Sequence, residues 1–117
     1  MIDGKDQRLY LTDLLERIQR IEAFTIEGPL AFEKSLVTQD AVIRNFEVIG
    51  EIVKRLDKAL TTLHPEVAWS GFAGFRDVLI HRYDNVVLGK VWETIVEDMP
   101  ALKSATLSLL KMTHPDD

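Results

Sequence analysis

Apolar residues recur at intervals of three and four along most of this chain, and no other feature constrains its fold as strongly. Leu11, Leu14 and Ile18 belong to one such series, and a second runs from Val42 to Leu60. Side chains at this spacing share one face of an α-helix, whereas a half-buried strand alternates every second residue. No stretch of useful length alternates in that way. The pattern therefore predicts an all-α chain.

Turn and capping residues divide this pattern into helices. We expect Asp6 to cap a first helix that ends near Thr25, and Gly28-Pro29 to break the chain before a short helical turn. The further helices are expected over about residues 38–60, 67–75, from an Asp84-Asn85 cap to Met99, and from Pro100 onward. We predict an up-and-down bundle of four main helices plus a short one, with residues 1–117 as a single domain.

Composition limits the environment and the partners. The chain has 117 residues, no cysteine and a net charge of −5. It therefore has no disulfide framework, and it has no apolar run long enough to span a membrane. The N-terminus lacks the layout of a signal peptide, so we expect a cytoplasmic protein. The acidic balance suits a partner with a basic surface, and we expect neither DNA nor a membrane as a partner.

Two neighbouring residues in the second long helix have a predicted role. Gly50 lies in the middle of the helix, where glycine is unfavourable, and this indicates close approach by another helix. Glu51 follows Glu47 by one turn, and such a pair could hold a metal. No His or further acid has suitable spacing, so we expect no metal and instead expect Glu51 to reach a cation.

The segment from Val67 to Phe75 carries no charge. Its aromatic residues recur every third position, and small residues such as Gly71 and Gly74 occupy the remaining faces. This composition predicts a buried helix. Because small residues let two backbones approach closely, the same helix could also form the seam of a homodimer.

Groups capable of proton and phosphate chemistry are concentrated in the next eight residues, Arg76 to Tyr83. Arginine suits a phosphate, and histidine exchanges protons near neutral pH. Arg76 and His81 could thus cleave a phosphodiester without a metal. Asp77 lies four residues before His81 and could orient its imidazole. Arg82 and Arg44 are further candidates for phosphate contact. A local cationic cleft could form around Arg76 and Arg82, with Arg44 or Lys90 added to it.

Helix geometry limits how this site can form. Arg76 and His81 are five residues apart, which corresponds to about 140° around an ideal helix. Either the helix unwinds before His81, or a second copy of the chain completes the site. The spacing alone is also compatible with ordinary exposed ion pairs, which contribute only about 0.2–0.5 kcal/mol each.

A family resemblance adds to this interpretation. Arg76-Asp77-x-x-x-His81-x-Tyr83 resembles the Arg-x4–6-His-x-Tyr signature of the HEPN superfamily, specifically its HepT-type toxins. The resemblance extends over roughly residues 8 to 110, and Ile49-Gly50-Glu51 is similar to the second-helix pattern of that family. Asp77 departs from the pattern, because asparagine is common there, and Ile52 replaces the usual alanine.

This resemblance implies a metal-independent endoribonuclease that acts as the toxin of a toxin–antitoxin pair. It implies a homodimer in which Arg76 binds phosphate and His81 transfers protons. Asp77 would orient either His81 or Arg76. No cofactor is expected. It also implies a minimal nucleotidyltransferase (MNT) antitoxin that silences the toxin by transferring AMP to Tyr83. The bulky, negatively charged phosphate ester would then occupy the cleft beside Arg76. Stacking on an RNA base is the alternative role for Tyr83.

Two non-catalytic alternatives remain. The chain could be a dimeric module that holds the nucleotidyltransferase or binds nucleotides, which its acidic surface and wide apolar faces would suit. It could also be a structural helical domain whose signature is a surface ion-pair cluster. In that case Arg76→Ala would change stability by less than about 0.5 kcal/mol and would change no activity.

Overall fold

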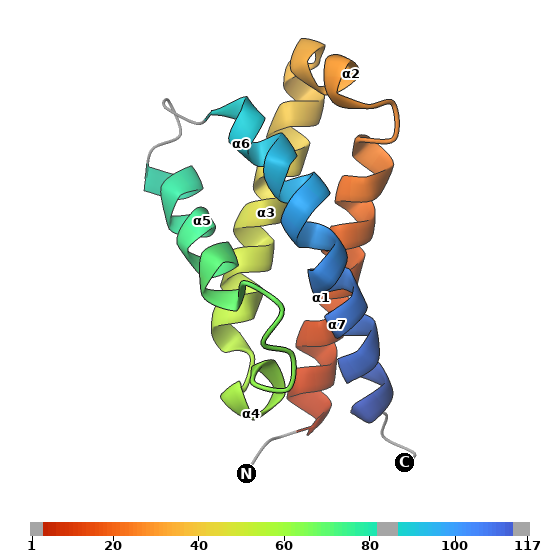
Figure 1. Cartoon of the computed structure of the whole chain (residues 1–117), viewed down its shortest axis with the longest axis vertical. Coiled ribbons are helices and arrows are strands. Elements are labelled where there is room, and N and C mark those ends of the chain that lie inside the picture. The colour runs from red at the N-terminus through yellow and green to blue at the C-terminus, as the bar shows by residue number, and fades with distance from the viewer. Residues whose placement is uncertain (1–3, 82–86, 114–117) are drawn as a thin grey trace.

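The chain folds into an elongated bundle of helices (Figure 1). The structure, a computed structural model, describes residues 4–81 and 87–113. The helices in chain order are α1 Gly4–Phe24, α2 Pro29–Lys34, α3 Leu36–Arg55, α4 Lys58–Thr61, α5 Trp69–His81, α6 Leu88–Glu93, the π-helical η2 Thr94–Asp98, and α7 Met99–Met112. No strand occurs in these ranges. The predicted all-α class is confirmed.

The long helices run up and down, with α3 at the centre (Figure 1). α3 packs along α1 on one side and along α5 on the other, and α1 also packs against α7. The short helices α2 and α4 lie at opposite ends of the bundle. α3 therefore provides the wall against which the candidate site on α5 is built.

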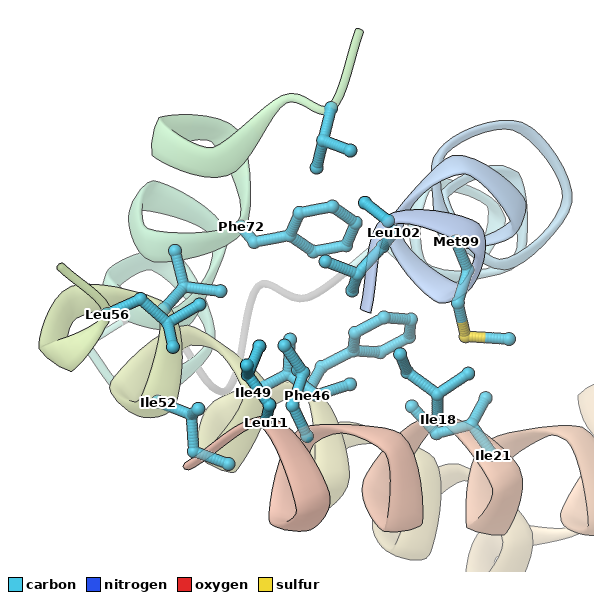
Figure 2. Packing of buried hydrophobic residues seen from close by; sticks show 14 of the residues in the cluster. Leu11, Ile18, Ile21, Phe46, Ile49, Ile52, Leu56, Phe72, Met99 and Leu102 are labelled. Carbon is cyan, nitrogen blue, oxygen red and sulfur yellow. The ribbon is translucent and has the colours of Figure 1, made fainter. Parts of the chain in front are cut away.

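The core comes from the predicted apolar stripes (Figure 2). α1, α3 and the α6–α7 segment supply most of it, and α5 adds Phe72 and Leu79. The side chains without any solvent exposure include Leu11, Leu14, Ile18, Ile21, Val42, Ile49, Leu79, Val91, Leu102 and Leu109. Burying a side chain of this size contributes about 1.5–3 kcal/mol. The three- and four-residue spacing therefore identified the buried faces of α1 and α3 correctly, whereas Val96 and Met112 of the later stripes are exposed.

The second long helix is shorter than predicted. α3 ends at Arg55, Leu56 is extended, and the Asp57 side chain caps the separate helix α4 by accepting a hydrogen bond from the Ala59 amide. Gln7 of α1 stabilises this break, because its side chain accepts from the Asp57 amide at 2.8 Å and donates to the Arg55 carbonyl at 3.4 Å. A contact from the far end of the chain thus ends the helix.

The last two predicted helices are in fact one helical run. α6 passes through η2 into α7 without leaving helical backbone angles. Pro100 has no amide hydrogen to donate, so the α-helical ladder cannot pass through it. The preceding turn widens instead, and the Met99 amide donates to the Thr94 carbonyl five residues earlier. Pro100 lies in the first turn of α7, so the prediction that it begins the last helix is confirmed. The π-helical turn η2 joins this helix to α6 without a loop.

The first helix also begins earlier than expected. α1 already includes Gly4, and Asp6 lies in its first turn rather than at the cap. An acidic residue in the first turn still interacts favourably with the helix dipole.

Candidate functional site

Helix α5 carries Arg76, Asp77 and His81. The turn before it is fixed by the Trp69 indole, which donates a hydrogen bond to the His64 carbonyl at 3.0 Å. Val67 is buried, and the Phe72 amide donates to the Ala68 carbonyl. α5 then remains helical through His81. The backbone therefore does not unwind before His81, and one of the two geometries left open by the sequence is excluded.

The close approach predicted at Gly50 is found between α3 and α5. A Cβ atom at position 50 would overlap the Cβ of Arg76 and lie 2.8 Å from the Phe72 carbonyl oxygen. On the same side of α5, the ring of Phe75 meets Phe46 of α3 edge-on, with 5.5 Å between centroids. Gly50 thus lets the stem of Arg76 lie directly against the α3 backbone.

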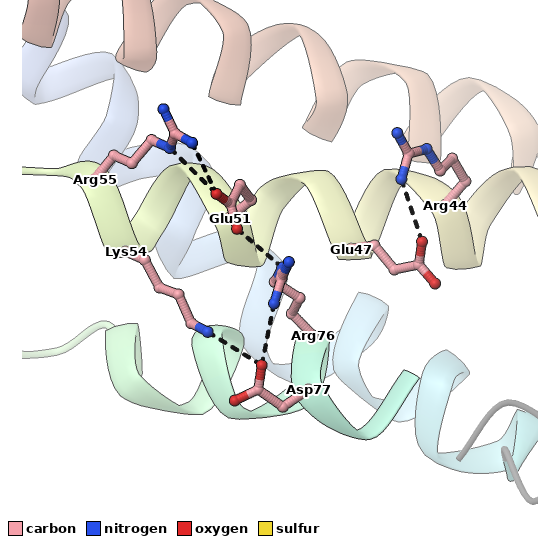
Figure 3. Close-up of polar contacts among 7 residues, drawn as sticks. All are labelled: Arg44, Glu47, Glu51, Lys54, Arg55, Arg76 and Asp77. Atoms are coloured by element: carbon pink, nitrogen blue, oxygen red, sulfur yellow. Dashed lines mark hydrogen bonds and ion pairs between the residues drawn. The ribbon is translucent and has the colours of Figure 1, made fainter. Parts of the chain in front are cut away.

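A chain of ion pairs surrounds Arg76 (Figure 3). Its Nε lies 3.1 Å from Glu51 Oε2, and its Nη1 donates to Asp77 Oδ1 at 3.2 Å. Glu51 also accepts from Arg55 at 3.0 Å, and Asp77 also accepts from Lys54 at 3.1 Å. The prediction that Glu51 reaches a cation of the signature is confirmed.

The charge of this cluster is slightly positive. Lys54, Arg55 and Arg76 supply three positive charges, and Glu51 and Asp77 supply two negative ones. The Arg76 side chain is 25% exposed, so it is partly accessible from solvent. A partly exposed cation held by fixed carboxylates can bind a phosphate while keeping a defined orientation.

Asp77 is held in its charged form. The hydrogen bond from Lys54 is the main cause that lowers the pKa of Asp77 below its ordinary value of 3.8, and Arg76 lowers it further. Asp77 is therefore a carboxylate at neutral pH, and it cannot donate a proton there. This leaves His81 as the residue of the signature suited to proton transfer among the described ones.

His81 lies on a different side of α5 from Arg76. It is exposed at the last residue of the helix, and no hydrogen bond between Asp77 and His81 is found within the described ranges. His81 is five positions after Arg76, which places the two side chains about 140° apart around the helix axis. A single chain therefore does not bring the two groups together on α5.

The other candidate residues have varied positions. Arg44 is 71% exposed and pairs with Glu47 at 3.4 Å, away from Arg76 along α3 (Figure 3). Lys90 pairs with Glu93 at 3.2 Å. Arg82 and Tyr83 lie outside the described residues, so their predicted roles stay predictions.

Sequence reasoning missed Lys54 and Arg55 as members of the site. A signal was available, because Lys54 follows Gly50 by four residues and so lies on the face predicted to meet another helix. Arg55 follows Glu51 at the same spacing. The spacing places both cations on one side of α3, but only the structure reveals which helix they meet.

An apolar pocket of about 310 Å³ opens on another side of α5. The rings of Phe72 and Phe75 and the exposed Val78 line it from α5, while Lys90 and Asp98 come from α6 and η2. It separates α5 from the α6–α7 run.

Within residues 4–81 and 87–113 no helix combines the length and the apolar character needed to cross a bilayer. Within the same ranges, no cluster of three or more acidic or histidine side chains is arranged to hold a metal ion.

Comparison with known proteins identifies related chains. A protein of Thermococcus cleftensis named "Probable ribonuclease HepT" is 44% identical over 105 residues, which cover 87% of this chain and 94% of the relative. A "Putative RNase" of Caldanaerobacter subterraneus subsp. tengcongensis is 36% identical over 111 residues, covering 92% of this chain and 96% of the relative.

A third relative is longer. The Methanocaldococcus jannaschii protein named "Gamma-glutamylcyclotransferase and putative RNase" is 39% identical over 108 residues, or 92% of this chain. The chain spans about half of that protein, 49% of its length. No solved structure shows a significant match.

The family model described as "Ribonuclease HepT-like" matches residues 14–109, which include both α3 and the signature on α5. The resemblance and the enzyme class predicted from the signature are therefore confirmed at the level of the family. This chain belongs to the HepT-like ribonuclease family.

Proposed function

We propose that this chain is a metal-independent endoribonuclease whose active site forms between two copies of the chain. One observation carries the proposal: Arg76 is fixed against α3, while His81 projects from another side of the same unbroken helix. A second protomer supplies the missing partner across the exposed side of α5. The family match and the relatives named as ribonucleases support RNA as the substrate.

The proposed chemistry uses the RNA itself as nucleophile. The 2′-hydroxyl oxygen attacks the adjacent phosphorus and the bond to the 5′-oxygen breaks, giving a 2′,3′-cyclic phosphate and a 5′-hydroxyl. His81 accepts or donates the protons that move in this step. Arg76 binds the phosphate oxygens as negative charge develops on them. Asp77, ionised at neutral pH, orients Arg76 rather than transferring a proton.

The exposed side of α5 suits the proposed dimer. Ser70, Gly71 and Gly74 are exposed, and a Cβ atom at Gly74 would meet nothing within 4 Å. These small residues, two to three turns before His81 on α5, would allow the backbone of a second α5 to approach closely. We therefore propose a homodimer whose two α5 helices face each other.

We further propose that the chain is the toxin of a cytoplasmic toxin–antitoxin pair. Its partner would be an MNT-type nucleotidyltransferase that transfers AMP to Tyr83, while Arg82 would contact RNA phosphate and Arg44 would remain a peripheral contact. Intact-mass measurement should detect AMP addition to the wild-type chain in the presence of the transferase and ATP. The Tyr83→Phe variant should not gain that mass.

The test is RNA cleavage by purified protein in EDTA, with wild type compared with Arg76→Ala and His81→Ala. We expect wild type to cleave and both variants to fall by at least about a hundredfold. Mixing the two inactive variants should restore part of the activity, because a mixed dimer retains one intact composite site. We expect about a quarter of wild-type activity if the subunits exchange at random, and about a half if every dimer is mixed. No recovery after verified subunit exchange would contradict the shared site, and loss of wild-type activity in EDTA would point to a metal.

One observation favours the alternative of a structural helical domain. Arg76 already pairs with two carboxylates, as expected of a structural ion-pair cluster. Under this alternative, Arg76→Ala would change stability by less than about 0.5 kcal/mol and would change no activity.

A further inference from the structure

Glu51 is the one acidic side chain of α3 that contacts Arg76 among the described residues. We infer that Glu51 is a positioning residue, which holds the Arg76 guanidinium by Nε so that its terminal amino groups face the RNA phosphate. This inference rests on the proposed ribonuclease function. It adds a residue outside the Arg-x4-His-x-Tyr signature to the machinery of the site.

Glu51 is itself immobilised. Its Oε1 accepts hydrogen bonds from both Nε and Nη2 of Arg55, at 3.2 and 3.0 Å, and this leaves Oε2 directed at Arg76 (Figure 3). A carboxylate held from one side by an arginine fork has little freedom to rotate. Glu51 therefore offers the Nε side of Arg76 a fixed negative charge in an ion pair.

The short distance between the two helices makes this contact specific. Gly50 precedes Glu51, and its missing side chain admits the stem of Arg76 against α3. Asp77 engages a second nitrogen, Nη1, at 3.2 Å. No hydrogen bond from Nη2 to another described residue is found, so we assign the end of the guanidinium that carries Nη2 to a ligand.

A purely stabilising role does not account for this arrangement. Glu51 is 40% exposed and Arg55 is 58% exposed, and ion pairs at that exposure contribute little to folding. Positioning has larger consequences, since a displacement of about 1 Å can cost a factor of 100 in rate. The network is therefore better explained by the orientation of Arg76 than by stability.

The test separates positioning from charge attraction. Glu51→Ala should lower kcat for RNA cleavage by about ten- to a hundredfold, because Arg76 loses its fixed orientation. The same change removes a negative charge beside the phosphate, so KM should stay constant or fall. Glu51→Gln retains an oxygen acceptor and should recover part of kcat.

Glu47→Ala is the matched control. Glu47 lies one turn earlier on α3 and pairs with Arg44, so its removal deletes the same charge without touching Arg76. We expect kcat of Glu47→Ala to remain near that of wild type. In an Arg76→Ala background, adding Glu51→Ala should cause no further loss, since the two residues act through one group.

A second measurement is independent of activity. The Nε–H resonance of Arg76, assigned with Arg76→Lys, should have the same NMR chemical shift in wild type and in Glu47→Ala, and should shift in Glu51→Ala, because the carboxylate 3.1 Å from Nε is removed. An unchanged chemical shift in Glu51→Ala, or wild-type kcat in that variant while Arg76→Ala is inactive, overturns the inference and leaves the proposed function standing. If Arg76→Ala cleaves RNA like wild type, the proposed function falls and the inference falls with it.

Discussion

The two sides of α5 are built differently. The side that faces α3 carries Phe72, Arg76 and Leu79, and each of them is buried or partly buried against a neighbouring helix. The opposite side carries Gly74 and His81, both exposed. One helix thus has a side completed by its own chain and a side that the described residues leave open.

Two glycines illustrate the difference between the two sides of α5. At Gly50, opposite the inner side of α5, an added Cβ would overlap Arg76, so the missing side chain is needed for packing. At Gly74, on the outer side, an added Cβ would meet nothing within 4 Å. The packing of this chain therefore explains the first glycine and leaves the second unexplained, which is consistent with a partner approaching the outer side.

The largest expected difference between the two sides is in stability. Leu79 has no solvent exposure, whereas the neighbouring Val78 is 47% exposed. Leu79→Ala should lower the free energy of unfolding by about 2–5 kcal/mol, because it removes buried methyl groups and leaves a cavity. Val78→Ala, the matched control, should change it by less than about 1 kcal/mol. Urea denaturation of both variants would measure this, and equal losses would show that the two sides do not differ in packing.

A smaller difference is expected at the two glycines. Gly50→Ala should destabilise the protein by about 1–3 kcal/mol, since α3 and α5 must separate to admit the methyl group. Gly74→Ala should stabilise the monomer by up to about 1 kcal/mol, because alanine favours the helix and the space is open. Thermal unfolding of the two variants should shift in opposite directions. A loss at Gly74 as large as that at Gly50 would mean that the outer side is already in tight contact.

Patterns within one helix were readable from the sequence, and contacts between distant segments were not. The three- and four-residue spacing identified the buried faces, and the position of Gly50 indicated close approach by another helix. The end of α3 at Arg55 could not be predicted, because Gln7, about fifty residues away, supplies its hydrogen bonds. Pro100 marked an interruption of the helical hydrogen bonds in the sequence, but not that a π-helical turn would carry the chain across it.

The same distinction applies to the candidate site. Arg76 and His81 were recognisable as types of residue at a known spacing, and their divergence around a helix followed from geometry. The partners of Arg76 depend on how α3 lies against α5. Glu51 was expected to reach a cation of the signature, yet Lys54 and Arg55 became part of the site only when the two helices were in place.

The smallest expected effect concerns Asp77, which lies at the border between the two sides. Its carboxylate accepts from Lys54 of α3, and this contact lowers its pKa in the folded chain. A lowered folded-state pKa stabilises the fold above the unfolded value, and this contribution is lost as the pH falls through the folded pKa. NMR titration of the side-chain carboxyl should therefore give a pKa below 3.8.

Two variants tell which side of α5 Asp77 belongs to. Lys54→Ala removes the main cause of the shift, so the pKa of Asp77 should rise toward its ordinary value. His81→Ala should leave that pKa unchanged, because no hydrogen bond joins the two residues in the described structure. The opposite outcome, a rise with His81→Ala and none with Lys54→Ala, would assign Asp77 to the outer side. It would then orient His81 instead of Arg76, and the inner side of α5 would end at the Arg76–Glu51 pair.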